Sequence, residues 1–326
     1  VGDLTQARRA GAGQSSRVNG YTSSGDFPQV DTIDKFPFST DANATDVGDV
    51  TVAGLGLSGQ SSSENGYSSG GSSRLNTIDK FPFATDANAT DVGDMVASSF
   101  FLAGQSSTEN GYHSGGAPAF NVIGKFPFAT DANSTDVGDL TQLRSQLAGQ
   151  SSLTHGYSSG GAPPATNSDV IDKFPFSSDE NATDVGNLTS AKYNLAGQSS
   201  ADNGYNSGGF DHPNVLINVI DKFPFSSVDA NATDVGDLTV ARANVAGQSS
   251  SSDGYSSGGS APFFNNTIDK FSFAADGNAT DVGDLTQARF GGAGQSSTEN
   301  GYASGGNIPA VNTIDKFPFS SNANAT

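Results

Sequence analysis

The sequence predicts an all-β fold, a seven-bladed β-propeller with four antiparallel strands per blade. Three observations predict it: a motif of about 47 residues occurs seven times, each copy holds four short strand-like segments, and no stretch shows the 3.6-residue period of a helix. A unit this small buries its faces only against neighbouring copies, so we expect a single domain over 1–326. The copies span 1–45, 46–90, 91–135, 136–183, 184–233, 234–280 and 281–326.

The four strands of a copy are separated by turns rich in Gly, Asn and Pro. In the third copy the expected strands are 103–107, 112–116, 121–128 and 135–141. The pair Asn110-Gly111 predicts a tight hairpin turn between the first and second strands. The first two strands contain almost only Gly, Ser, Ala and Gln, and such small side chains suit the crowded axis of a ring.

The third strand carries apolar residues on both of its faces. In the second copy, alternation places Phe81 and Phe83 on one face and Ile78 on the other. A blade that lies between two other blades requires two apolar faces. Pro82 cannot donate a backbone hydrogen bond, which predicts a position near the end of the strand.

The two ends of the chain are out of phase by one strand. Residues 1–8 match a fourth strand, whereas the last copy ends after its third strand. We therefore expect Val1–Thr5 to pair with Asn312–Phe319 and to complete the last blade. The chain begins without Met and ends on a repeat boundary, and we interpret it as a processed product or part of a longer polypeptide.

The order of the recurring residues resembles that of the kelch family, whose propeller repeats also form the central domain of galactose oxidase. A tyrosine precedes a glycine pair in every copy, from Tyr21 to Tyr302. The pairs are Gly70-Gly71, Gly115-Gly116, Gly160-Gly161, Gly208-Gly209, Gly258-Gly259 and Gly305-Gly306, with Ser24-Gly25 in the first copy. The resemblance implies a propeller but no single activity, because kelch-like propellers serve as enzymes, adaptors and adhesins.

Two departures from the kelch pattern stand out. Valine replaces the family's tryptophan, as at Val92 and Val137. The arginine that closes each repeat is Arg8, Arg144, Arg242 and Arg289, becomes Lys192, and is absent at Gly54 and Ser99. A copper site of the galactose-oxidase type needs Tyr, His and Cys, and the chain has no Cys.

The chain is strongly acidic, with a net charge of −19 and a pI near 4.2. Binding to nucleic acid or to anionic lipid is therefore unfavourable. The acidity belongs to the repeat, because 24 of the 34 acidic residues occupy four recurring positions, represented by Asp79, Asp86, Asp91 and Asp94. No apolar run reaches 18 residues, so we expect no membrane insertion.

Two segments vary freely between copies: the loop between the second and third strands, and the connection from one blade to the next. In a propeller both emerge on the same face. Every aromatic residue outside the recurring positions lies in these segments, namely Phe27, Phe100, Phe101, Phe120, Tyr193, Phe210, Phe263, Phe264 and Phe290. Varied aromatics favour a binding surface. The alternative is that they fill local gaps between blades.

Polar residues of these loops are Arg9, Arg17, Arg74, His113 and His212, most of which we expect to be solvated. The three histidines, His113, His155 and His212, fall in three different copies, and the repeated Gly-Gln-Ser-Ser serines have no accompanying His and acid. We therefore predict no catalytic residues and no cofactor.

The segment Asp86-Ala-Asn-Ala-Thr-Asp91 could offer oxygen ligands to calcium, but it lacks the glycine and the glutamate of an EF-hand loop. We expect instead an Asx-type turn, in which Asp86 and Asn88 bond nearby backbone amides, and no metal. The same segment is an N-glycosylation sequon in every copy, at Asn43, Asn88, Asn133, Asn181, Asn231, Asn278 and Asn324. These asparagines are glycosylation sites only if the protein is secreted by a eukaryotic cell.

The sequence therefore predicts a non-catalytic structural or adhesive module. The repeat sequence is similar to repeats in structural or tail-associated proteins of marine bacteriophages. The motifs that carry this resemblance are GQSS, GYxSGG and KFPF followed by NATDVGDLT. This resemblance implies a virion or extracellular location and a partner that is a particle protein or a host surface glycan, bound through the variable face. The alternative is a secreted or cell-surface glycoprotein, a lectin or a fibril subunit.

Overall fold

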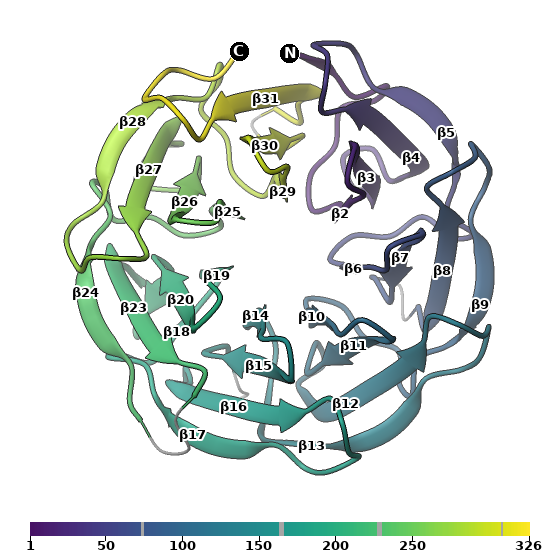
Figure 1. The fold of residues 1–326 in the computed structure, drawn as a ribbon, viewed down its shortest axis with the longest axis horizontal. Coiled ribbons are helices and arrows are strands. Elements are labelled where there is room, and N and C mark those ends of the chain that lie inside the picture. The colour runs from purple at the N-terminus through teal and green to yellow at the C-terminus, as the bar shows by residue number, and fades with distance from the viewer. Residues whose placement is uncertain (73–74, 163–165, 227–229, 308) are drawn as a thin grey trace.

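A computed structural model describes residues 1–72, 75–162, 166–226, 230–307 and 309–326. Its elements are β-strands, and seven four-stranded antiparallel sheets stand in a ring around a central axis (Figure 1). The prediction of an all-β propeller is confirmed. Within the described residues, no helix is long and apolar enough to cross a membrane.

Each sheet runs from an inner strand at the axis to an outer strand at the rim (Figure 1). The inner strands are β2 (Ala12–Ser15), β6 (Ser58–Ser61), β10 (Ala103–Ser106), β14 (Ala148–Ser151), β19 (Ala196–Ser199), β25 (Ala246–Ser249) and β29 (Ala293–Ser296). The second strands are β3 (Asn19–Gly25), β7 (Asn65–Ser69), β11 (Asn110–Ser114), β15 (His155–Ser159), β20 (Asn203–Ser207), β26 (Asp253–Ser257) and β30 (Asn300–Ser304).

The third strands are β4 (Val30–Pro37), β8 (Thr77–Pro82), β12 (Phe120–Pro127), β16 (Val170–Pro175), β23 (Val219–Pro224), β27 (Thr267–Ser272) and β31 (Thr313–Pro318). The outer strands are β5 (Thr45–Asp49), β9 (Thr90–Asp94), β13 (Thr135–Arg144), β17 (Thr183–Asn187), β24 (Thr233–Asp237), β28 (Thr280–Asp284) and β1 (Gly2–Asp3). A small three-stranded sheet, β18 (Lys192–Tyr193), β21 (Phe210–Asp211) and β22 (Val215–Leu216), adds to the connections of the fifth sheet. As the sequence predicts, Pro82 ends its strand.

The seventh sheet is completed by the beginning of the chain. Gly2 pairs with Ile314 and Asp3 with Thr313, both antiparallel. Leu4, the next residue, is only 1% exposed and packs in a cluster with Phe36 and Tyr302. The predicted pairing of the two ends is therefore observed.

The hairpin between the first and second strands differs from the prediction. Asn110 and Gly111 belong to β11, where Gly111 pairs with Ser106, and the turn is made by Thr108 and Glu109. The Ser107 hydroxyl closes the turn by accepting a hydrogen bond of 2.9 Å from the Asn110 amide. Gly111 is needed for packing, since a Cβ there would lie 2.2 Å from the Phe126 ring.

The core lies between the sheets and repeats at each of the seven interfaces. Tyr21 of the first sheet stacks on Phe83 of the second, with ring centroids 4.9 Å apart, and contacts Phe81 at 5.4 Å. Ile33, on the opposite face from the first sheet's own Phe36, belongs to the same cluster as Phe81. The apolar residues on both faces of the third strand thus fill two different interfaces, as expected.

A ring of glutamines joins the inner strands to the next sheet. Gln105 Nε2 donates to the Tyr157 carbonyl at 2.9 Å and lies 3.0 Å from the Ser158 hydroxyl, and Gln105 is 2% exposed. The same glutamine-to-tyrosine bond occurs at all seven interfaces, including the closing one from Gln295 to Tyr21. The recurring Gly-Gln-Ser-Ser segment is therefore an interface element.

Candidate functional site

The two variable connections lie side by side on one face, which we call the loop face. Backbone bridges join them: Phe100 pairs with Ala117, and Phe290 with Asn307. In the fifth copy the same contact is extended, since Tyr193 of β18 pairs with Phe210 of β21. The opposite face, which we call the hairpin face, carries the turns between first and second strands. The residues that differ most between copies therefore lie on the loop face.

A closed ring of backbone hydrogen bonds surrounds the axis on the loop face. Seven residues at one repeat position form this mouth ring: Ala10, Gly56, Phe101, Gln146, Asn194, Asn244 and Gly291. The amide of each donates to the carbonyl of the preceding member at 2.8–3.2 Å, and the bond from Ala10 to Gly291 closes the ring. All seven have positive φ, between 53° and 69°. Non-glycine residues are strained in this region, so the ring holds a costly conformation at its five non-glycine members.

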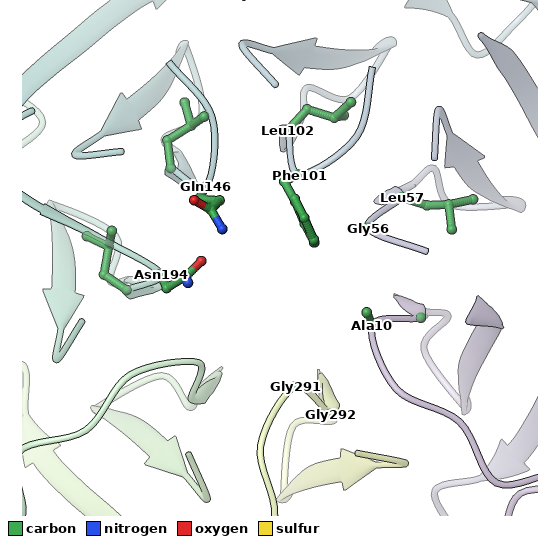
Figure 2. A pocket seen from close by; sticks show the side chains of 12 residues that line it. Ala10, Gly56, Leu57, Phe101, Leu102, Gln146, Asn194, Gly291 and Gly292 are labelled. Atoms are coloured by element: carbon green, nitrogen blue, oxygen red, sulfur yellow. The ribbon is translucent and has the colours of Figure 1, made fainter. Parts of the chain in front are cut away.

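The mouth ring encloses a cavity of about 240 Å³ on the axis. Figure 2 shows the side chains of Phe101, Gln146 and Asn194 directed into this opening, with Leu57 and Leu102 among the residues around them. None of the residues that line the cavity is charged. Ala10, Gly56 and Gly291 contribute little or no side chain, so the ring is aromatic and amide-bearing on one side and open on the other.

The predicted aromatic residues form separate pairs on the loop face. Phe100 and Phe101 lie 5.0 Å apart between ring centroids, Tyr193 stacks on Phe210 at 5.4 Å, and Phe264 stacks on Phe290 at 5.8 Å. Phe263 is 84% exposed, Phe27 is 59% exposed, and Phe120 begins β12 half-buried. The aromatic residues therefore surround the mouth ring in patches, and only Phe101 lines the cavity.

The polar residues predicted for this face have different fates. The Arg9 guanidinium lies over the Phe27 ring, 4.4 Å from its centroid. His212 is exposed. Arg17 lies with Ser249 and Ser250 on the hairpin face instead, because its copy places it in the first hairpin turn. His113 is buried in β11, and Arg74 lies outside the described residues.

The closing arginines, for which the sequence analysis predicts no role, form buried ion pairs with the third strand of the next sheet. Arg144 Nη2 lies 2.6 Å from Asp172 Oδ2, and both side chains are fully buried. The same pair recurs as Arg8–Asp34, Lys192–Asp221, Arg242–Asp269 and Arg289–Asp315. The aspartate also accepts a hydrogen bond from a threonine hydroxyl, Thr141 at 2.8 Å in this case. Each pair joins the chain at or after the end of one sheet's outer strand to the third strand of the next sheet.

In the third sheet the ion pair is lost as a unit. Ser99 replaces the arginine and Gly124 replaces the aspartate, while His113 faces Gly124 across the strands. A Cβ on Gly124 would lie 2.1 Å from the imidazole, and His113 Nε2 is 3.0 Å from the Ser134 hydroxyl, where six copies have alanine. Burial lowers the pKa of His113 to about 4. His113 therefore fills the space that the ion pair occupies in other copies.

In the second sheet only the aspartate remains. Asp79 is 1% exposed, and Gly54 stands where other copies have arginine. Leu75 approaches Gly54 within 3.1 Å of a Cβ position and fills part of the space. Asp79 accepts bonds from the Thr51 amide and hydroxyl, at 3.0 and 2.7 Å. Burial raises the pKa of Asp79, and the Thr51 hydrogen bonds only partly oppose this.

The acidic turn of each copy binds the neighbouring sheet, which corrects the expected local Asx turn. Asp86 forms a salt bridge with Lys35, and Asn88 Oδ1 accepts from the Asp49 amide at 3.2 Å, both in the preceding sheet. The local Asx contact is made by Asp91, which accepts from the Gly93 amide at 3.1 Å. Within the described ranges, no group of three His, Cys, Asp or Glu side chains is placed to hold a metal ion.

The seven sequon asparagines are exposed and occupy equivalent positions. The side-chain oxygen of each one accepts a hydrogen bond from a backbone amide of the preceding sheet. Asn133, for example, accepts from the Asp94 amide at 3.0 Å. Glycosylation attaches sugar to the nitrogen of the side chain, so it is compatible with this bond. The recurrence of the asparagine is already explained by the interface it makes.

Comparison with known proteins supports the fold and nothing finer. No family model matches the sequence, and no curated protein matches it significantly. Among solved structures, the chain is similar to a kelch-type propeller reported as "Structure of YjhT", with a TM-score of 0.66 and 12% sequence identity. The match covers 99% of this chain and 98% of that one. At this identity the likeness shows a shared propeller architecture.

Proposed function

We propose that the protein is a seven-bladed kelch-like propeller that acts as a non-catalytic recognition module and binds its partner through the loop face. The carrying observation is the distribution of differences between the copies. The interfaces repeat and the hairpin turns keep one length, whereas the loop face varies both in loop length and in residues, and its mouth ring presents Ala, Gly, Phe, Gln, Asn, Asn and Gly at one backbone conformation. A constant scaffold whose variation is concentrated on one face is typical of a binding surface.

The seven four-stranded sheets support a count of seven blades, in which the three-stranded sheet is an elaboration of the fifth loop. The exposed aromatic residues Phe27, Phe263 and Phe264 favour contact with a partner, because aromatic side chains are enriched at protein interfaces. We propose a surface glycan as the partner, with a protein of a larger assembly as the alternative. A virion or extracellular setting fits both and rests on the resemblance of the repeats.

The test is binding of the fluorescently labelled protein to a glycan microarray that carries neutral and acidic glycans. Replacing Phe100, Phe101, Phe263 and Phe264 with Ser should abolish binding. The matched control is Leu153→Ser, which removes a 93% exposed apolar side chain from the hairpin face. Near-ultraviolet circular dichroism checks that each variant is folded. Equal loss in both variants, or no binding of the unmodified protein, would overturn glycan recognition by the loop face.

A second candidate is a secreted glycoprotein, a lectin or fibril subunit. It is favoured by the exposure of all seven sequon asparagines, whose hydrogen bonds to the preceding sheet use the side-chain oxygen. The intact mass of the protein from its natural source tests this directly. A mass equal to that of the unmodified chain would exclude glycosylation at these positions.

A further inference from the structure

We infer that the axial cavity inside the mouth ring is a binding site for one uncharged sugar residue, such as a terminal hexose of a glycan. This deepens the proposed function and rests on it. The cavity is the place on the loop face where an aromatic ring, two side-chain amides and an apolar wall converge (Figure 2).

The amides of Gln146 and Asn194 are available to a ligand. Both line the cavity, and in the described part of the chain neither side chain forms a hydrogen bond. Asn244, the next member of the ring, differs because its amide donates to the Ser260 hydroxyl at 3.2 Å. A side-chain amide both donates and accepts, which is the pattern that the hydroxyl groups of a sugar require.

The aromatic ring stands beside these amides. Phe101 lies against Gly56, where a Cβ would come within 2.8 Å of the phenyl ring, and its other neighbour is Phe100. Phe101 holds φ of 55°, a conformation that a bulky residue rarely adopts. The apolar C–H face of a pyranose packs on such a ring while its hydroxyl groups reach the amides.

The electrostatics and the size select the class of ligand. No charged residue lines the cavity, so an anionic or cationic ligand would lose its hydration without gaining a partner. The net charge of −19 further disfavours acidic sugars. The volume of about 240 Å³ is below the roughly 300–1,000 Å³ of pockets that hold drug-sized molecules, which favours a single ring.

The backbone around the cavity is hydrogen-bonded before a ligand binds. All seven backbone amides of the mouth ring are already used in the ring, so the backbone has no free donor to rearrange. Leu102 and Leu147, which follow Phe101 and Gln146 in the chain, are buried in the interfaces below. A preorganised site loses less conformational entropy on binding.

The experiment is saturation-transfer NMR on the full chain with D-galactose, D-glucose and N-acetylglucosamine, and with N-acetylneuraminic acid as the anionic comparison. We expect binding of at least one neutral sugar. Gln146→Ala and Asn194→Ala should each weaken it roughly five- to tenfold, the effect of one or two lost neutral hydrogen bonds. Asn244→Ala is the matched control and should leave binding unchanged, because Asn244 is not among the residues that line the cavity and its Nδ2 bonds Ser260.

Gly291→Phe tests the cavity without removing any amide. The open side of the ring has room, because nothing lies within 4 Å of a Cβ at Gly291, and Phe101 already adopts the same conformation in the ring. The added phenyl ring should fill the cavity and abolish sugar binding. Binding that survives this change, absence of binding by any neutral sugar, or preference for the acidic sugar would overturn the inference. The array distinguishes this failure from failure of the proposed function. If the axial site fails these tests but replacing Phe263 and Phe264 still abolishes glycan binding on the array, the loop face recognises the glycan without the axial site.

Discussion

Arg144 and Asp172 form a fully buried ion pair between consecutive sheets, with 2.6 Å between Nη2 and Oδ2. The guanidinium also donates to the carbonyls of Val170 at 2.8 Å and Ser158 at 2.9 Å. One arginine side chain therefore ties the end of the third sheet to two strands of the fourth. Four further copies of this pair lie at other interfaces, beside the Tyr, Phe and Ile side chains of the core.

Replacing Arg144 with Met should destabilise the protein by about 3–5 kcal/mol, because Asp172 then remains buried without its counter-charge. The measurement is the free energy of unfolding in urea at pH 7. Leu143→Ser is the matched control, since the adjacent side chain is 46% exposed and its loss should change stability by less than about 0.5 kcal/mol. Similar stabilities for the two variants would show that the ion pair does not stabilise the interface.

Asp79 has no arginine partner, so removing its charge should have the opposite effect on stability. Burial raises its pKa in the folded protein above the ordinary value of an aspartate, so the folded state binds the proton more tightly than the unfolded state. The stability contribution of Asp79 is therefore present at low pH and is lost as the pH rises through the folded pKa. Asp79→Asn removes this loss and can still bond Thr51, so we expect equal or higher stability at pH 7.

The measurement for Asp79→Asn is the free energy of unfolding across pH 4 to 8, compared with the unmodified protein. The two curves should converge at low pH and separate as the pH rises. Asp172→Asn is the control: it leaves Arg144 without an anion and should lower stability at pH 7. Parallel curves for Asp79→Asn would mean that Asp79 is charged at no cost in the fold.

The third copy offers a test of coupled substitutions. Gly124→Asp restores the usual residue but brings a side chain onto the His113 imidazole, and we expect a loss of about 1–3 kcal/mol from overpacking and a buried charge. Adding Ser99→Arg, His113→Ser and Ser134→Ala, the residues of other copies, should recover the stability. Thermal unfolding of the single and quadruple variants measures this. If the quadruple variant is no more stable than Gly124→Asp alone, the four positions are not coupled.

His113 itself predicts a pH dependence. Burial lowers its pKa in the folded protein to about 4 from the ordinary value of 6.5, so the folded state resists protonation. The stability that neutral His113 contributes is present above pH 6.5 and is lost as the pH falls toward 4, by about 3 kcal/mol in total. Combining His113→Ser with Ser134→Ala should remove this loss between pH 6.5 and 4. An unchanged slope over that range would contradict the buried neutral imidazole.

The extent to which the sequence predicts these features depends on whether residues recur. Every copy has Tyr, Phe and Ile at the positions equivalent to Tyr21, Phe81 and Ile33, so the interface that they form could be expected from the pattern. The mouth ring could not, because its members share a backbone conformation and no side-chain chemistry. One sequence feature could have indicated the ion pairs. The arginine and the aspartate of one pair are both replaced, by Ser99 and Gly124. The hairpin was misplaced because Gly111 is selected by the Phe126 ring and not by the turn.

Deletion of residues 1–8 tests the closure of the ring. The deletion removes the pairing of Gly2 and Asp3 with β31, the buried Leu4 side chain and the Arg8–Asp34 ion pair. The melting temperature should therefore fall strongly, and by more than in Arg8→Met, which removes the ion pair alone. The excess of the deletion over the point variant measures what the strand itself contributes. Adding the peptide of residues 1–8 to the truncated protein should raise its melting temperature with peptide concentration, because a ligand that binds only the folded state stabilises it. A truncated protein as stable as Arg8→Met would show that β1 does not hold the first and last sheets together.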